Sequence, residues 1–232
     1  AALSNLALWL DASDSASVTH SSNAVSQWSD KSGNNKHATQ STATRKPIFN
    51  SSDPSLNNKG SVSSASSDGS IGLSLPSATL QEIFVIAYYK EGTDNTFDSH
   101  STLLSGPGDY GVYRIMGTVN SAAWIGSSNF NESGSFKNGS SSSSSTALPM
   151  PATLLRFTST TARTEARGIL YNTQHSDRGW LGGVGEIIGL SAISSASDRL
   201  ATEGYLANKW GLTSSLPSNH SHKTLSLTRG PI

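Results

Sequence analysis

The chain has 232 residues, no cysteine and a formal net charge of +0, with 34% hydrophobic and 14% charged residues. This composition excludes a disulfide framework and a cysteine nucleophile, and the balanced charge argues against a nucleic-acid partner, which would require a basic face. No apolar run reaches the length of about 18 residues that a membrane span needs. The length fits one all-β domain, and the abundance of Ser, Asn and Gly suits short strands joined by turns.

Short apolar runs separated by turn residues predict a succession of β-strands. The predicted strands cover residues 6–10, 25–28, 80–90, 102–104, 111–119, 122–125, 153–158, 166–171 and 184–193. The run over 80–90 is apolar on both faces, with Leu80 on the same face as Phe84, which predicts a central strand covered on both sides. The runs at 153–158 and 166–171 are spaced as the two strands of a hairpin. Many short strands of this kind predict an all-β, two-sheet antiparallel sandwich.

Two polar features mark the connections between these strands. The dipeptide Asn138-Gly139 stands between polar flanks, which is typical of a tight hairpin turn. The segments 50–70 and 140–145 are rich in serine and low in complexity. We expect both segments to form surface loops or edge strands.

One α-helix is predicted near the C-terminus, over residues 195–210. Ser195 followed by Asp198 has the pattern of a helix N-cap, and Gly211 suits the left-handed position that ends a helix. An apolar stripe is expected to face the sheet and consists of Ala196, Leu200, Leu206, Ala207 and Trp210.

The polar residues of this helix and of the segment after it are predicted to have other surroundings. Tyr205 and Lys209 fall outside the apolar stripe. Glu203 lies among the apolar positions, so we expect it to form an ion pair inside the helix–sheet interface. His220 and His222 stand in a polar tail and are expected to be solvated, because two ligands alone make a weak metal site.

The stretch WSDKSGNNKHATQ has two interpretations. As a turn, it gives structural roles to Trp28, Asp30, Gly33, Asn34 and His37. The Asp30 carboxylate then accepts N–H bonds, and Gly33 or Asn34 takes a positive φ. As a metal loop, Asp30 combines with Asp11 and Asp14 to hold Ca²⁺, which prefers about 6–8 oxygen ligands. The turn interpretation needs fewer assumptions, because this stretch contains a single carboxylate.

Both ends of the chain resemble the concanavalin A-like, laminin-G-type jelly-roll domains of bacterial surface and phage virion proteins. The first motif is matched by Trp28, Asp30, Ser32, Gly33, Asn34, His37 and Ala38, and the second by Gly204, Tyr205, Leu206, Lys209, Trp210, Gly211, Leu212, Leu216 and Pro217. The resemblance implies a jelly-roll domain over 1–213, followed by a C-terminal polar tail over 214–232. It also implies an extracellular module that is often sugar-binding and seldom catalytic, since fold alone does not settle function.

Candidate functional residues follow from the chemistry of sugar recognition, which combines aromatic faces with amides and acids. The candidates are Asp109, Tyr110, Tyr113, Trp124, Asn129, Asn131 and Trp180. Glycoside hydrolysis needs two carboxylates across a cleft, but Glu82 and Glu186 each stand alone in their strands. We therefore expect a non-catalytic glycan-binding or adhesion module. A structural subunit with protein partners only is the alternative, and a glycoside hydrolase is a remote third.

Overall fold

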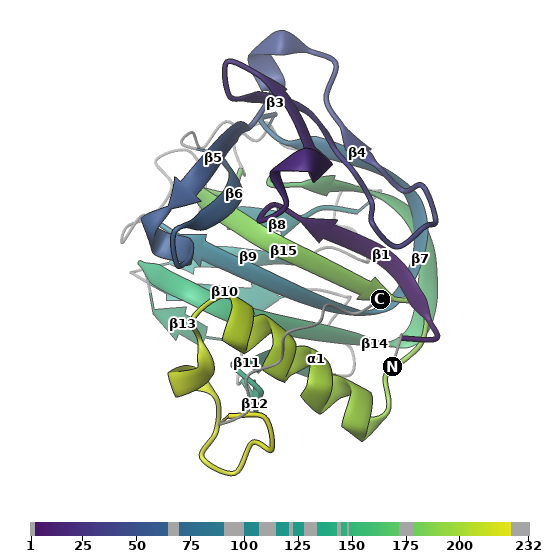
Figure 1. Cartoon of the computed structure of the whole chain (residues 1–232), viewed down its shortest axis with the longest axis vertical. Helices are drawn as coiled ribbons and strands as arrows, with labels where there is room; N and C mark the ends of the chain where they lie inside the picture. Colours follow the sequence, from purple (N-terminus) through teal and green to yellow (C-terminus); the bar gives the residue numbers. More distant parts are fainter. Residues whose placement is uncertain are drawn as a thin grey trace.

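The computed structural model describes residues 3–64, 70–90, 100–106, 115–120, 123–127, 134–142, 145–147, 149–171 and 179–223. The structure is mostly antiparallel β-sheet, with 51% of its residues in strands and one helix near the C-terminus (Figure 1). The strands are β1 (Leu6–Asp11), β2 (Val18–Ser21), β3 (Ala24–Trp28), β4 (Ala38–Thr39), β5 (Ile48–Asp53), β6 (Lys59–Ser64), β7 (Leu73–Tyr89), β8 (His100–Leu104), β9 (Ile115–Asn120), β10 (Ala123–Ser127), β11 (Gly134–Lys137), β12 (Ser140–Ser141), β13 (Ser145–Ala147), β14 (Met150–Ile169) and β15 (Gly182–Leu190). The α-helix is α1 (Ala196–Lys209), and short 3₁₀ turns occupy Ser15–Ser17, Ala43–Arg45, Pro54–Leu56 and Thr213–Ser215.

The strand β7 lies at the centre of the sheet, between β14 and β15. Its side chains alternate between two apolar layers, and all of them from Glu82 to Tyr89 are buried, which confirms the prediction of a strand covered on both sides. The face assigned to Leu80 was wrong. Leu80 packs in the same layer as Ile83 and not with Phe84, because the pairing with β14 shifts between Glu82 and Leu80. Such an irregularity moves the following side chains to the opposite face.

Two apolar layers lie on opposite sides of the central strands. One layer contains Leu8, Leu10, Trp28, Phe49, Ile83, Val85, Tyr89, Trp180 and Ile187 among its members. The other contains Trp9, Phe84, Ile86, Tyr88, Leu154, Ile188, Leu206, Ala207 and Trp210. The helix α1 crosses the second face and buries its apolar stripe there (Figure 1). Of the predicted stripe, Leu206, Ala207 and Trp210 are buried, whereas Ala196 is exposed at the first turn.

The strand β14 replaces a predicted hairpin. The two apolar runs at 153–158 and 166–171 belong largely to one strand that follows β7 along its length. The polar residues between them form an irregularity in the pairing, because Thr158 opposes Glu82 and Arg163 opposes Leu80. Polar side chains that suggested a turn are accommodated here as a bulge within a continuous strand.

Part of the serine-rich segment 50–70 lies inside the sheet, where a surface loop or an edge strand was expected. Residues 59–64 form β6, which pairs with β15 on one side and β5 on the other, so it is not an edge strand. Ser61 is fully buried and donates its hydroxyl to Asp53 Oδ2 at 2.7 Å. A small hydroxyl can be buried at little expense when it finds a partner, and composition alone does not reveal that partner.

Local signals at helix and hairpin ends are confirmed. Ser195 caps α1 by accepting a hydrogen bond from Asp198 N at 3.1 Å, and Gly211 has φ +73° just after the helix. Asn138 and Gly139 both have positive φ between β11 and β12, as a tight hairpin turn requires. The packed unit extends past residue 213, since Leu216 is buried beneath α1. No helix within the described ranges is long and apolar enough to cross a membrane.

Candidate functional site

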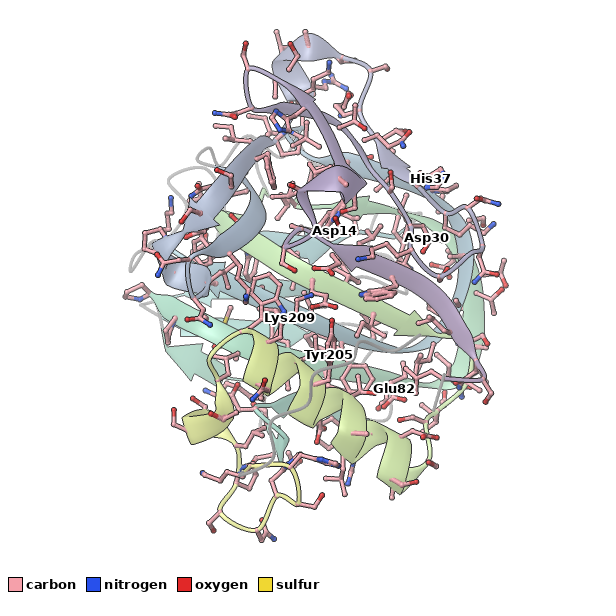
Figure 2. All side chains as sticks on the ribbon, in the orientation of Figure 1. Asp14, Asp30, His37, Glu82, Tyr205 and Lys209 are labelled. Atoms are coloured by element: carbon pink, nitrogen blue, oxygen red, sulfur yellow. The ribbon has the colours of Figure 1, made fainter. Side chains whose placement is uncertain are left out.

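The turn after β3 is organised by one carboxylate. Asp30 Oδ1 accepts the backbone N–H groups of Trp9 and Ser32, each at 2.9 Å, and Oδ2 accepts that of Lys36 at 2.9 Å. His37 Nδ1 accepts the N–H of Asp30 itself at 3.0 Å. Figure 2 shows Asp30 and His37 beside β1. The turn interpretation of Asp30 and of His37 is therefore confirmed.

The remaining residues of this turn fix its shape and attach it to β1. Gly33 has φ +88°, where a side chain would be strained, and Asn34 donates its amide to Leu6 O at 3.0 Å. Trp28, the last residue of β3, is completely buried in the core. The predicted positive-φ position thus falls on Gly33, and Asn34 acts through its side chain.

The three carboxylates of the calcium hypothesis face other partners. Asp30 is engaged by backbone N–H groups, as described above. Lys31 Nζ lies 3.2 Å from Asp11 Oδ2 and 2.8 Å from Asp14 Oδ2, so an ammonium group stands between those two acids. Among the described residues no group of three or more His, Cys, Asp or Glu side chains is arranged to hold a metal. Calcium binding stays a prediction that a chelator can test.

A polar cluster lies under α1, between the helix and the strands β1 and β15. Its centre is Glu186 of β15, which is completely buried. The indole N–H groups of Trp9 and Trp210 each donate to this carboxylate at 2.7 Å, and the Tyr205 hydroxyl donates at 3.0 Å. Lys209 Nζ donates to Oε2 at 2.8 Å. Four donors thus compensate for the burial of one carboxylate.

Lys209 joins this carboxylate to the first strand. Its Nζ atom lies 2.7 Å from Asp11 Oδ1 and 3.1 Å from the Tyr205 hydroxyl, and the rings of Tyr205 and Trp210 lie within reach of its charge. Only 15% of the Lys209 side chain is exposed. Figure 2 shows Tyr205 and Lys209 projecting from α1 toward the sheet. We call Asp11, Glu186, Tyr205, Lys209 and Lys31 the Lys209 cluster.

Burial and charge act in opposite directions on the acids of the Lys209 cluster. Burial raises the pKa of the Glu186 carboxyl, and the nearby Lys209 ammonium offsets only part of this rise. Burial also acts to raise the pKa of Asp11, but Lys209, Ser13 and Lys31 together hold it below its ordinary value. Burial, followed by the charges of Glu186 and Asp11, raises the pKa of the Tyr205 hydroxyl. Of these two acids, Glu186 is therefore the stronger proton acceptor.

The sequence-based assignment of the helix missed this cluster. Tyr205 and Lys209 were placed outside the buried stripe, yet both turn inward because Glu186 and Asp11 provide partners. A long lysine side chain can bury its methylene groups while its ammonium group reaches a carboxylate. The signal available in the sequence was Glu186 itself, since an acid inside an apolar strand requires a buried donor.

Glu203 and His220 form a second buried pair. The two side chains meet at 3.1 Å, and each is almost completely buried. Glu203 was expected to pair inside the helix–sheet interface, and His220 was expected in solvent. Glu203 is buried and paired as expected, with His220 as its partner. The expectation that His220 is solvated was wrong, because the chain after Pro217 folds back onto α1 and brings the imidazole to the carboxylate.

The candidate sugar-binding residues are mostly beyond the described ranges. Asp109, Tyr110, Tyr113, Asn129 and Asn131 lie outside the described residues, and for Trp124 in β10 only the backbone is described.

The assignment of Trp180 as a sugar platform was wrong. It is completely buried, donates its indole N–H to Tyr88 O at 3.0 Å and packs edge-on against Tyr89. A tryptophan in that position supports the core and has no face free for a ligand.

The chain matches no protein-family model, and comparison with curated proteins and with solved structures gives no match. The likeness to concanavalin A-like domains therefore rests on the two motifs at the ends of the sequence. Function has to be argued from the arrangement of the described side chains.

Proposed function

We propose that the chain is a non-catalytic module displayed outside a cell or on a virion, built as a jelly-roll sandwich and binding glycans. The proposal that the module is non-catalytic is supported by its acidic side chains, which are already bound to other groups of the chain. Every Asp and Glu side chain of the described ranges already has a hydrogen-bond or ion-pair partner: Asp11, Asp14, Asp30, Asp53, Glu82, Glu165, Glu186, Asp198 and Glu203.

These partners matter because hydrolysis of a glycosidic bond needs an acid and a second carboxylate that both face the sugar. Glu82, one acid of the central strand, is completely buried and bound by Arg156 and by Ser194 N. Glu186, an acid of β15, is held by four donors. Carboxylates held in this way stabilise the fold and do not meet a substrate.

The glycan site is proposed for the segment 109–131, which combines aromatic rings with amides and an acid. Rings of this kind stack on the apolar face of a pyranose, and amides and carboxylates bind its hydroxyl groups. Affinity for one sugar would be low at a shallow site. Display of many copies would raise the avidity by a factor of about 10²–10⁴ without new contacts.

A structural subunit with only protein partners is the second candidate. It is favoured by the surface of the described residues, where Ile48 and Ile193 are the exposed large hydrophobic side chains and every aromatic side chain is buried or half-buried. A sugar platform would present an exposed ring. In this second function the partners are other subunits of a virion or an extracellular filament.

The test is a glycan array probed with the purified chain in multivalent form, with calcium and again with chelator. Saturable binding to one sugar class that Trp124→Ala reduces, and that the exposed control Ile48→Ala leaves unchanged, would establish the glycan function. Loss of binding with chelator would add calcium to the site. A blank array from a folded, multimerised sample would reject glycan binding in favour of the structural subunit.

A further inference from the structure

The Lys209 cluster brings an amine and two carboxyl groups together in a largely buried site. Lys209 Nζ lies 2.7 Å from Asp11 Oδ1 and 2.8 Å from Glu186 Oε2. The Asp11 side chain is 6% exposed and that of Glu186 is 0% exposed. The rings of Tyr205, Trp210 and Trp9 surround the three charged groups. A nucleophile, an electrophile and a base are therefore held in contact before any reaction begins.

We propose that Lys209 Nζ and Asp11 Cγ form an intramolecular amide bond, with loss of one water molecule. The Lys209 ammonium group passes one proton to the Asp11 carboxylate, which gives a neutral amine and a neutral carboxylic acid, and the amine attacks Asp11 Cγ. Glu186 takes the second proton from the attacking nitrogen along their hydrogen bond, and the leaving hydroxyl group receives it. The bond from Cγ to Oδ2 then breaks. Two of the three ammonium protons leave nitrogen and Oδ2 gains two, so the leaving group is water. One positive and one negative charge disappear together, and no oxidant or external reactant is needed.

The surroundings of Asp11 favour it over Glu186 as the electrophile. Oδ1 accepts the N–H of Ser13 at 3.1 Å and its hydroxyl at 2.6 Å, donors that stabilise the negative charge developing on this oxygen. Lys31 Nζ lies 3.2 Å from Oδ2, and its positive charge stabilises the leaving oxygen. The Lys31 side chain is 26% exposed, so the released water has a route to solvent.

Glu186 has the properties of the base. Both of its oxygens are bound by donors, and it is completely buried, so a leaving water would have no exit there. Burial raises the pKa of this carboxyl, which strengthens it as a proton acceptor for Lys209.

The proposed bond would join parts of the chain that lie far apart in sequence. Asp11 ends β1 and Lys209 ends α1, and 198 positions separate them. Fixing two reacting groups in one site gives effective concentrations of about 10⁵–10⁸ M in favourable cases, which offsets the unfavourable condensation in water. The chain has no cysteine, and an amide would supply a covalent staple that no reductant opens.

Intact-mass spectrometry of the full chain under denaturing conditions tests this inference. After prolonged incubation of the folded protein at neutral pH, we expect a mass about 18 Da below that of the sequence, the loss of one water. Peptide mapping should then find one linked species that contains both Asp11 and Lys209. A folded wild-type chain at its full mass would overturn the proposal, and so would a linkage to Glu186.

Variants separate this bond from other losses of water. Lys209→Arg keeps the positive charge without a nucleophilic amine and should restore the full mass, and Glu186→Gln should slow the loss at least about 10-fold, as removal of a general base does. The matched control Lys46→Arg changes a lysine outside the Lys209 cluster and should keep the loss. Persistence of the loss in Lys209→Arg, as an aspartyl succinimide would show, would refute the bond. The wild-type mass decides the question even if Lys209→Arg does not fold, and it does so independently of glycan binding.

Discussion

Replacing Asp30 by alanine tests whether the turn at residues 28–40 is a structural device. The substitution removes the acceptor for three backbone N–H groups, those of Trp9, Ser32 and Lys36, each at 2.9 Å. The first of these contacts is buried, and the other two are half-buried. A hydrogen bond to a charged acceptor contributes about 1.5–3 kcal/mol, and water can replace part of the two outer bonds.

We therefore expect Asp30→Ala to lower the free energy of unfolding by about 3–4 kcal/mol, roughly 2 from the buried bond and the remainder from the outer ones. For a domain of this size each kcal/mol corresponds to about 2–4 °C, so Tm should fall by about 10 °C. The assay is urea denaturation followed by tryptophan fluorescence, with calorimetry for Tm. Asp30→Asn keeps one carbonyl acceptor and should lose about half as much.

The matched control is Asp14→Asn, because Asp14 is 42% exposed and its ion pair with Lys31 should contribute less than about 1 kcal/mol. A loss below about 1 kcal/mol for Asp30→Ala would refute the structural role. The wild-type protein should unfold identically with and without chelator. If chelator lowered its stability, and Asp30→Ala abolished that effect, a calcium site would replace the turn interpretation.

Three further substitutions test other parts of the structure. Gly211→Ala should destabilise the chain by about 1–2 kcal/mol in urea titrations, because φ is +73° there, and an equal stability would mean that the helix ends differently. The pKa of Glu186 is raised in the folded state, so the free energy of unfolding should fall as the pH rises from about 4.5 through the folded pKa. Glu186→Gln should flatten this pH dependence. An unchanged pH dependence in the variant would contradict the assignment. His220→Ala should lose about 2 kcal/mol by leaving Glu203 buried without its partner, more than His222→Ala, and equal losses would argue against the pair.

The parts of the fold that short-range contacts determine were predictable from the sequence. The cap at Ser195 depends on a residue three positions away, and the turn at Asn138-Gly139 depends on its own backbone angles. The role of Asp30 is partly of this kind, because Ser32 and Lys36 lie within the same turn. In each case the residue type and its immediate neighbours carry the physical cause.

The elements that were wrongly predicted depend on contacts beyond the immediate neighbours in sequence. The sequence pattern places Lys209 outside the buried stripe, because it does not show that Asp11, at the other end of the chain, lies against this lysine. The burial of Ser61 depends on Asp53 across a strand pair. Trp180 has the residue type of a sugar platform, and only its packing against Tyr89 identifies it as core. Periodicity predicts which face of an element a residue occupies, but it does not identify the distant partner that allows a polar side chain to be buried.

Trp9 connects the two polar features of the molecule. Its backbone N–H donates to Asp30 and its indole N–H donates to Glu186, so one residue of β1 is held by the turn on one side and by the Lys209 cluster on the other. Among the described strands, β1 stands at one end of the sheet order and pairs only with β15. An edge strand is easily displaced or paired with another chain. Because these contacts hold β1 through both its backbone and its side chain, they keep that edge closed, and an amide from Asp11 would make the same attachment permanent.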